Sequence, residues 1–214
     1  GLAIHIGSQL LDLKPLDRAF NIAINAANEL LSLGINIKNI DFGGGLGVNY
    51  VGEKPPNLVD YASIIKKNTD DKNFNIFIEP GRRIVANGGI LITKVIYKKT
   101  NGDKKFLIVD AAMNDLLRPS LYDAKHKIKP IFEKLNAKIE KFEVVGPICE
   151  SGDILAKNVA LPEETSEELL AIYSAGAYGS VMSSNYNSRL LVPEVLVKEK
   201  QYSIIRKRQT YDEL

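Results

Sequence analysis

The sequence has one cysteine among 214 residues, Cys149, and two histidines. A single thiol excludes an internal disulfide framework and fits a reducing compartment, so we expect a cytoplasmic protein. No second histidine or cysteine lies at metal-ligand spacing from another, so we expect no zinc site. Any chemistry of this chain must therefore come from other residue types or from an organic cofactor.

An excess of charge of either sign is also lacking. The 28 Lys and Arg residues nearly balance the 26 Asp and Glu residues, for a formal net charge of +2. This balance provides no electrostatic footprint for nucleic acid or an anionic membrane. No apolar run approaches the roughly 20 residues that span a bilayer. We therefore expect neither nucleic acid nor a membrane as a partner.

The first part of the chain alternates predicted strands with predicted helices. Apolar residues recur at helical spacing over 16–31 and 58–65, with Gly34 as a natural stop for the first helix. Short apolar runs predict strands at 4–6, 37–42 and 74–79, the last of them buried on both faces. This alternation predicts parallel βαβ units whose motif-bearing strand ends meet on one side of the sheet.

After about residue 85 the pattern changes to strands separated by turn signals. Strands are predicted at 90–97, 106–110, 142–145 and 192–197. Helical periodicity is scarce there, with a possible helix only at 166–175 and a solvated loop over 162–168. We expect an α/β domain over residues 1–84, followed by an all-β domain, a sandwich or open barrel, over residues 85–214.

The lone thiol lies in the run VVGPICESGD, residues 144–153. The proline lacks the N–H that a strand needs, so the preceding strand should end at Gly146-Pro147. Cys149 and Glu150 then lie on the loop past a strand end, where reactive groups are usually displayed. Cys149 could donate a proton there, and Glu150 could bind an ammonium group. The alternative is a small buried hydrophobic side chain, since free cysteine is often buried.

Two further strand ends carry motifs suited to anions. DFGGGLG, residues 41–47, places three glycines where backbone N–H groups could hold phosphate oxygens, or could simply form a turn. The run lacks the lysine of a P-loop. EPGR, residues 79–82, could bind a cationic ring nitrogen through its carboxylate and an anion through glycine and arginine. The alternative is an exposed Glu–Arg ion pair.

Other candidates are a histidine, an arginine and two tyrosines. His5 is predicted in a strand, either as a core residue or lying flat over an aromatic cofactor whose phosphate Ser8 would contact. Arg118 and Tyr122 suit a substrate carboxylate, or are a surface arginine and a packed ring. Tyr178 lies between small residues in GAYG, where backbone or cofactor can approach closely.

Together these runs resemble the fold-type III pyridoxal-phosphate decarboxylases, and within them the diaminopimelate decarboxylases. Six motifs occur in the order of that family between residues 5 and 179: HIGS, DFGGG, EPGR, LRPSLY, CESGD and GAYG. The resemblance implies the C-terminal half of an alanine racemase-like (β/α)8 barrel, followed by the β domain. It also implies decarboxylation of meso-2,6-diaminopimelate to L-lysine and CO2, the last step of bacterial lysine biosynthesis.

The resemblance implies pyridoxal 5′-phosphate as cofactor and assigns residues to it. His5 would stack on the pyridine ring, and Glu79 would pair with the ring nitrogen. The phosphate would be held by Ser8, the Gly44-Gly45 loop and the Gly81 backbone. Arg82 and Tyr178 complete the residues assigned to the cofactor.

The resemblance assigns a second set of residues to the substrate. Arg82, Arg118 and Tyr122 would hold its distal carboxylate, Glu150 its distal ammonium, and Tyr178 would contact both substrate and cofactor. Cys149 would protonate the substrate carbon that has lost CO2. In the family Cys149 and Glu150 act in the partner subunit's site, so a homodimer with shared active sites is expected.

One family element is missing, because the Schiff-base lysine lies on an earlier barrel strand, upstream of Gly1. We therefore expect a fragment that is inactive alone. A zwitterionic distal end satisfies both the arginine clamp and Glu150, which favours meso-diaminopimelate. The alternatives are a polyamine-pathway decarboxylase acting on ornithine, arginine or carboxynorspermidine, and a non-catalytic binding homologue like the antizyme inhibitors.

Overall fold

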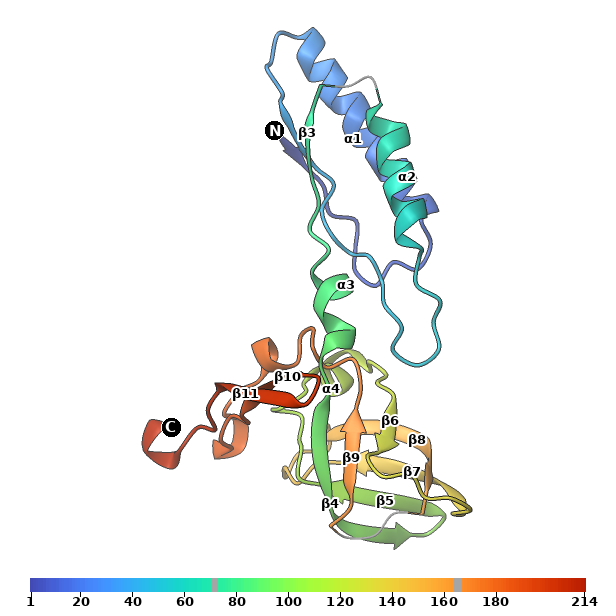
Figure 1. Ribbon diagram of the computed structural model, residues 1–214, viewed down its shortest axis with the longest axis vertical. Coiled ribbons are helices and arrows are strands. Elements are labelled where there is room, and N and C mark those ends of the chain that lie inside the picture. Colours follow the sequence, from blue (N-terminus) through green and yellow to red (C-terminus); the bar gives the residue numbers. More distant parts are fainter. Residues whose placement is uncertain (71–72, 164–166) are drawn as a thin grey trace. The chain divides into compact units, whose positions relative to one another are not determined.

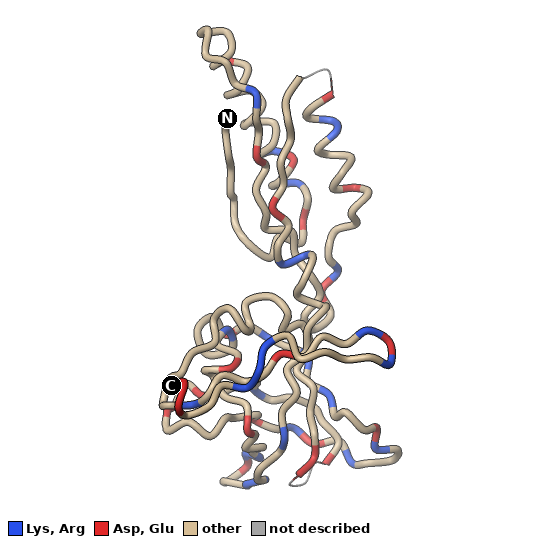
Figure 2. Tube along the Cα trace, turned by 60° about the vertical axis from the view of Figure 1, so that its left-hand side comes forward, with Lys and Arg blue, Asp and Glu red and all other residues tan. Residues whose placement is uncertain are grey.

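The computed structural model describes residues 1–70, 73–163 and 167–214. The chain divides into two compact units, Gly1–Gly88 and Gly89–Leu214. Charges of both signs are interspersed along the chain (Figure 2). None of the helices in the described ranges is both long and apolar enough to cross a bilayer.

The first unit contains a short parallel sheet with helices between its strands. Strands β1 (Leu2–Ala3), β2 (Asn39–Asp41) and β3 (Asn75–Phe77) lie in that order, β1 and β3 each parallel to β2. Helices α1 (Lys14–Ser32) and α2 (Leu58–Thr69) connect them and lie on the same side of the sheet (Figure 1). The predicted parallel βαβ pattern is confirmed.

The core of this unit lies between the helices and the sheet. The Phe20 ring on α1 is fully buried and stacks on Phe42, with ring centroids 4.1 Å apart. Tyr61 of α2 packs edge-on against Phe20 at 6.1 Å. The helical spacing of apolar residues over 16–31 thus corresponds to the buried stripe of α1, and Gly34 follows the helix with φ of +80°.

Two predictions about the strands of this unit are wrong. His5 is not in a strand, because β1 ends at Ala3 and His5 lies exposed in the extended segment that follows. The run 74–79 is not buried on both faces, since Phe77 and Ile78 are 51% and 44% exposed. The physical reason is that α1 and α2 cover one face of the sheet (Figure 1): Ile76 packs on that side, and Phe77 alternates to the other face.

A short helical segment closes the first unit. Helix α3 (Gly81–Val85) begins directly after the motif EPGR and continues into the 3-10 turn η1 (Ala86–Gly88). Arg82 is buried within α3.

The second unit is built on a six-stranded mixed sheet with the order β6-β9-β4-β5-β7-β8. Most neighbours are antiparallel, but β5 and β7 are parallel. The two strands at the ends of this order, β6 and β8, also contact each other, so the sheet is nearly closed. Its strands are β4 (Leu91–Asn101), β5 (Lys104–Val109), β6 (Ile128–Pro130), β7 (Ile139–Val145), β8 (Ile154–Pro162) and β9 (Leu169–Ile172).

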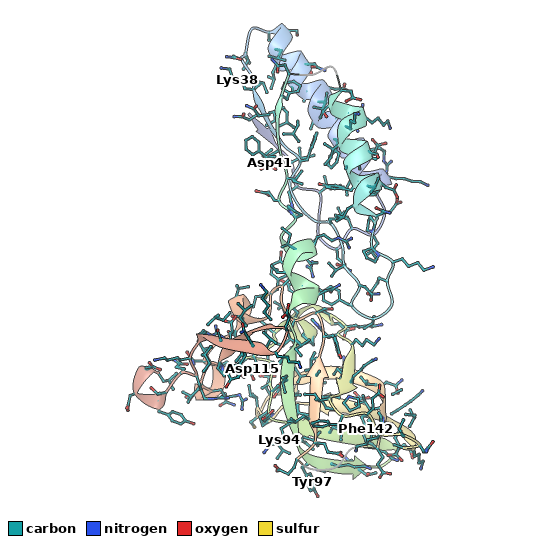
Figure 3. The ribbon with its side chains drawn as sticks, in the orientation of Figure 1. Lys38, Asp41, Lys94, Tyr97, Asp115 and Phe142 are labelled. Carbon is teal, nitrogen blue, oxygen red and sulfur yellow. The ribbon has the colours of Figure 1, made fainter. Side chains whose placement is uncertain are left out.

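Residues that alternate along these strands form the core of the second unit. Phe142, labelled in Figure 3, is 1% exposed and lies among fully buried aliphatic side chains such as Leu107 and Val144. The predicted strands at 90–97, 106–110 and 142–145 correspond to β4, β5 and β7. The strand-rich second part that the pattern predicted after about residue 85 thus contains this mixed sheet.

The possible helix at 166–175 is wrong. Over the described part of that stretch the chain forms β9, which pairs antiparallel with both β4 and β6. Leu170, Ala171 and Ile172 are all buried there, so the run has neither helical nor alternating periodicity. Residues 164–166, which belong to the predicted loop over 162–168, lie outside the described residues.

The remaining elements are short. Helix α4 (Arg118–Tyr122) follows β5, and a separate antiparallel hairpin joins β10 (Glu194–Lys198) to β11 (Gln201–Arg206). The predicted strand at 192–197 corresponds to β10. Three further 3-10 turns are η2 (Ser180–Met182), η3 (Tyr186–Ser188) and η4 (Tyr211–Glu213).

Candidate functional site

The three consecutive glycines bring three strand-end segments into close contact. A Cβ added at Gly43, Gly44 or Gly45 would lie 2.1–2.2 Å from a backbone carbonyl oxygen, of Ile4, Glu79 and Gly7 respectively. Because real Cβ atoms never come so close, only glycine allows these backbones to meet. The motifs predicted to meet at one side of the sheet therefore do so within the first unit.

Backbone hydrogen bonds fix this meeting point. The Asp41 carboxylate, at the end of β2 (Figure 3), accepts a bond of 2.8 Å from the Gly43 amide. The Gly43 carbonyl accepts one of 2.9 Å from the Glu79 amide. Within the described residues, the amides of Gly44 and Gly45 donate to no protein acceptor. Two N–H groups at a strand end are thus available to an anion.

A buried arginine contacts Ser8 in the same unit. Arg82 is 6% exposed and donates a hydrogen bond of 2.9 Å from Nη2 to the Ser8 hydroxyl oxygen. Its Nη1 donates to the Tyr50 hydroxyl, whose ring also lies 5.6 Å from the guanidinium carbon. Since Ser8 accepts from Arg82, its own hydroxyl proton can be donated to a ligand. The set of Ser8, Gly44 and Gly45 thus provides donors that suit a phosphate group.

The other candidates of the first unit lie on the segments that surround this set. His5 and Glu79 both have exposed side chains, His5 just after β1 and Glu79 just after β3. The Gly81 amide donates to the Glu79 carbonyl at 2.8 Å. The Gly81 N–H is therefore used within the chain, unlike the amides of Gly44 and Gly45.

In the second unit, Arg118 lies between two tyrosine rings. Its guanidinium carbon is 5.2 Å from the Tyr122 ring centroid and 5.3 Å from the Tyr178 centroid. Its Nε atom is buried and has no acceptor among the described residues. A half-buried cation that is held by aromatic faces and lacks an anion is suited to binding a carboxylate.

Tyr178 has an unusual backbone. Its φ is +57°, a left-handed conformation that costs a non-glycine residue about 1–2 kcal/mol. The next residue, Gly179, closely approaches the Ala175 carbonyl, which a Cβ would meet at 2.3 Å. This tight turn directs the Tyr178 ring toward Arg118.

Cys149 and Glu150 are both exposed on the loop that joins β7 to β8. Strand β7 ends at Val145, so the predicted end at Gly146-Pro147 is confirmed and the alternative of a buried thiol is wrong. The Tyr186 hydroxyl donates to Glu150 Oε2 at 3.2 Å, and this bond raises the pKa of Tyr186.

A buried polar network supports the same region of the second unit. Asp115, labelled in Figure 3, is 4% exposed, and burial raises its pKa. It accepts from the Ala112 amide at 2.9 Å and forms an ion pair with Arg189 at 3.3 Å. Arg189 also donates to Asn114 at 2.8 Å. The network joins the segment before α4 to the segment that carries Tyr186.

Sequence patterns did not reveal the roles of Asn114, Asp115, Asp153, Tyr186 and Arg189. Their hydrogen bonds are to residues far away in the sequence or to backbone groups, and neither kind of partner leaves a pattern in the sequence. Asp153 belongs to the motif CESGD, which was the only available signal.

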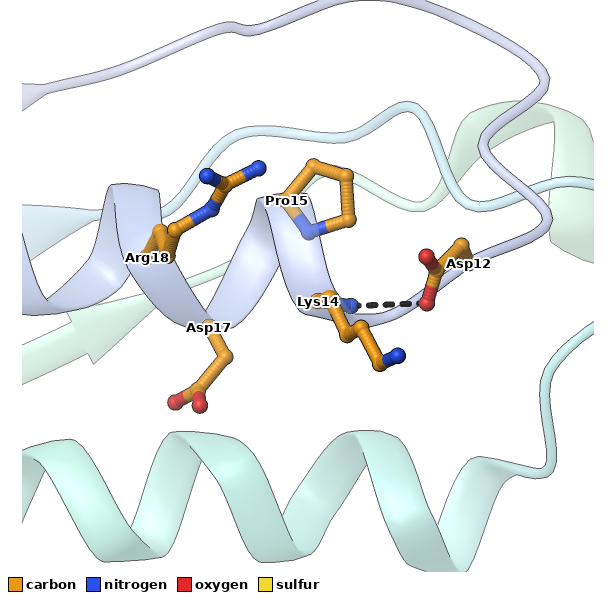
Figure 4. Close-up of a pocket in the computed structure, with 5 residues that line it drawn as sticks. All are labelled: Asp12, Lys14, Pro15, Asp17 and Arg18. Carbon is orange, nitrogen blue, oxygen red and sulfur yellow. Dashed lines mark hydrogen bonds between the residues drawn. The ribbon is translucent and has the colours of Figure 1, made fainter.

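A surface depression elsewhere has no relation to these residues. It lies at the start of α1 and is lined by Asp12, Lys14, Pro15, Asp17 and Arg18 (Figure 4). None of the predicted site residues lines it. In the described ranges no group of three His, Cys, Asp or Glu side chains could hold a metal ion.

The structure thus places the predicted residues in one cluster in the first unit and two groups in the second. The cluster of the first unit contains His5, Ser8, Gly44, Gly45, Glu79, Gly81 and Arg82. In the second unit, Tyr122 and Tyr178 gather around Arg118, and Cys149 and Glu150 share one loop.

Relatives of known function match the whole chain. It is 44% identical to the diaminopimelate decarboxylase of Zymomonas mobilis over 216 residues, covering 100% of this chain and 51% of that protein. It is 46% identical to the Helicobacter pylori enzyme, covering 98% of this chain and 52% of that protein. The chain therefore spans about half the length of the curated relatives it matches.

The fold comparison agrees. The crystal structure of a Helicobacter pylori diaminopimelate decarboxylase mutant complexed with L-lysine superposes with a TM-score of 0.93 at 45% identity. That match covers 99% of this chain and 52% of the other. Residues 17–176 match the family model described as "Pyridoxal-dependent decarboxylase, C-terminal sheet domain". The chain belongs to the pyridoxal-dependent decarboxylase family.

Proposed function

We propose that this chain forms part of a diaminopimelate decarboxylase, which converts meso-2,6-diaminopimelate to L-lysine and CO2. Relatives at 44–46% identity support the activity. The surroundings of Arg118 are the observation that supports the choice of substrate. Its guanidinium lies between two rings and has no carboxylate partner among the described residues. A substrate with a distal carboxylate would supply that partner.

The first unit would bind pyridoxal 5′-phosphate. The free amides of Gly44 and Gly45 and the Ser8 hydroxyl fit a phosphate, and the buried Arg82, which bonds to Ser8, adds positive charge. Bound pyridoxal phosphate supplies an electron sink for the electron pair left on the substrate when CO2 departs. His5 would cover the ring, and Glu79 would keep a proton on the ring nitrogen.

The proposed roles of three further residues, Gly81, Arg82 and Tyr178, remain predictions. Gly81 would add to the phosphate contacts, although its amide bonds to Glu79 in the structure. Arg82 would assist Arg118 with the distal carboxylate. Tyr178 would contact both substrate and cofactor.

The second unit would act on the substrate. Arg118 and Tyr122 would bind the distal carboxylate, and Glu150 would accept hydrogen bonds from the distal ammonium group. The thiol of Cys149, exposed on its loop, would deliver its proton to the α-carbon after CO2 has left. Cys149 and Glu150 would serve the partner subunit's site in a homodimer.

The fold of the whole protein is also a proposal. The parallel β1-β2-β3 sheet with its covering helices supports a segment of a (β/α)8 barrel over residues 1–84. The nearly closed mixed sheet supports a barrel-like or sandwich domain over residues 85–214.

The proposal is tested by Arg118→Ala in the full-length protein. Loss of a charge-assisted hydrogen bond costs about 1.5–3 kcal/mol, which corresponds to roughly a 10- to 150-fold fall in kcat/KM for meso-diaminopimelate. Activity on plain lysine, which has no distal carboxylate, should not fall with it. Arg208→Ala, an exposed arginine of the same unit, is the matched control.

An unchanged preference for diaminopimelate over lysine in Arg118→Ala would defeat the assignment of Arg118. Higher activity of the unaltered protein on ornithine than on diaminopimelate would instead favour the polyamine-pathway alternative. Absence of turnover on any of these substrates would favour a binding homologue.

A further inference from the structure

The loop that carries Cys149 and Glu150 is held by one buried carboxylate. Asp153 is 3% exposed and begins the return from this loop to β8. Its Oδ2 accepts from the Ile148 amide at 2.8 Å, within the loop. Its Oδ1 accepts from the Met113 amide at 2.7 Å, on the segment that leads into α4. One side chain therefore joins the loop to the segment that precedes Arg118.

A glycine makes room for this carboxylate. A Cβ added at Gly146 would lie 2.3 Å from Oδ2 and 2.6 Å from Oδ1 of Asp153. The Gly146 amide also donates to the Asp153 carbonyl at 3.1 Å, which closes the base of the loop. Both bonds to the carboxylate thus depend on the absence of a side chain at Gly146.

A second bond ties the same loop to α4 itself. The Ser120 hydroxyl donates to the Gly152 carbonyl at 2.6 Å. Ser120 is two positions after Arg118 in the same short helix. The loop that carries the thiol is therefore connected to the segment before α4 by the Asp153–Met113 bond, and to α4 itself by the Ser120–Gly152 bond.

We propose that Asp153 is a positioning residue, which holds the loop that carries the Cys149 thiol in place against the segment before α4. The proposal rests on the proposed function, because it assigns Cys149 as the proton donor. A charge-assisted bond to a backbone N–H is short and directional, so two of them at one carboxylate hold the loop in a single geometry. Small displacements of a reacting group lower rates steeply. Asp153 itself needs no contact with substrate.

Two variants in the full-length holoenzyme remove this arrangement in different ways. Asp153→Asn replaces one acceptor oxygen with an NH2 group that cannot accept from an amide. Gly146→Ala leaves the carboxylate but displaces it. Asp103→Asn, an exposed aspartate in the turn between β4 and β5, is the matched control.

Hydrogen exchange gives a readout that does not depend on the reaction. In both variants, amide protection should fall at least about 10-fold in peptides covering 111–117 and 146–152. Strands β5 and β7 should keep their protection, because the sheet is intact. Unchanged protection at 111–117 and 146–152 in both variants would overturn the proposal, as would an equal loss throughout the second unit.

Kinetics then separate positioning from general destabilisation. With meso-diaminopimelate, kcat should fall about 10- to 100-fold in Asp153→Asn while KM changes little. In a Cys149→Ala background, Asp153→Asn should cause no further loss of kcat. Additive losses would contradict an action through Cys149.

Two further results separate a failure of this proposal from a variant that does not fold and from a failure of the proposed function. If Asp153→Asn fails to fold, Ser120→Ala removes only the bond to Gly152 and should give a smaller loss of protection confined to 146–152. If the unaltered protein does not turn over diaminopimelate, the proposed function fails, whereas the exchange experiment still decides whether Asp153 holds the loop.

Discussion

Gly44 offers the sharpest test of how the first cluster is built. Its φ is not in the left-handed region, so alanine would suffer no backbone strain there. Its added Cβ, however, would lie 2.1 Å from the Glu79 carbonyl oxygen and 3.1 Å from the carbonyl carbon. The two segments would have to separate by about 1 Å to restore an allowed contact.

The magnitude follows from the kind of atom that is struck. Overpacking costs about 1–3 kcal/mol when side chains can adjust. Here the obstacle is a backbone oxygen that no rotamer change can move, so we expect a loss near the upper end, about 3 kcal/mol. The shift would also displace Glu79 and the Gly44 amide, so affinity for pyridoxal phosphate should fall.

Urea denaturation and cofactor titration of full-length Gly44→Ala measure these two effects. Gly88→Ala is the matched control, because its Cβ would meet nothing within 4 Å and its φ is not left-handed. The argument is refuted if Gly44→Ala and Gly88→Ala have the same free energy of unfolding and the same cofactor affinity.

Two further predictions concern stability. Phe20→Ala removes a fully buried, stacked ring and should lower the free energy of unfolding, measured by urea denaturation, by about 3–5 kcal/mol. The control is Ile22→Ala, an exposed position on the same helix, which should change this free energy by less than about 0.5 kcal/mol. Comparable losses in both would show that the Phe20 stack contributes little. A hydrogen bond from Lys105, helped by two other lysines, lowers the pKa of Glu140 from 4.5 to about 2. Because this pKa is depressed in the folded state, the stabilisation is present above pH 4.5 and lost as the pH falls toward 2. Urea denaturation from pH 7 to 2 should therefore show a higher free energy of unfolding for the unaltered protein than for Glu140→Gln, by an amount that is constant above about pH 5 and disappears near pH 2. Glu133→Gln, at an exposed position, is the control. A difference that does not depend on pH would contradict an origin in the ion pairs of Glu140.

The sequence predicts those parts of the molecule that depend on local patterns. Apolar periodicity predicted α1 and α2, and the proline after Gly146 predicted the end of β7. The glycines at 43–45 predicted a close backbone approach, because no other residue type permits one.

Other features depend on neighbours that a linear pattern does not identify. The continuous apolar run at β9 fits either a helix or a buried strand, and only its pairing with β4 and β6 decides between them. The apolar character of Phe77 suggested burial, but Phe77 alternates to the face of the sheet opposite α1 and α2 (Figure 1). The bond of Asp153 to Met113 joins residues 40 positions apart, so no short motif could reveal it.

The left-handed backbone of Tyr178 has a consequence for engineering. Glycine would relieve its strain and asparagine would tolerate it, so a screen that selects only for thermal stability would favour both. Either change would remove one of the two rings that hold Arg118. Stabilising this protein at Tyr178 would thus remove a ring contact of Arg118, and a directed-evolution library should leave this codon unvaried.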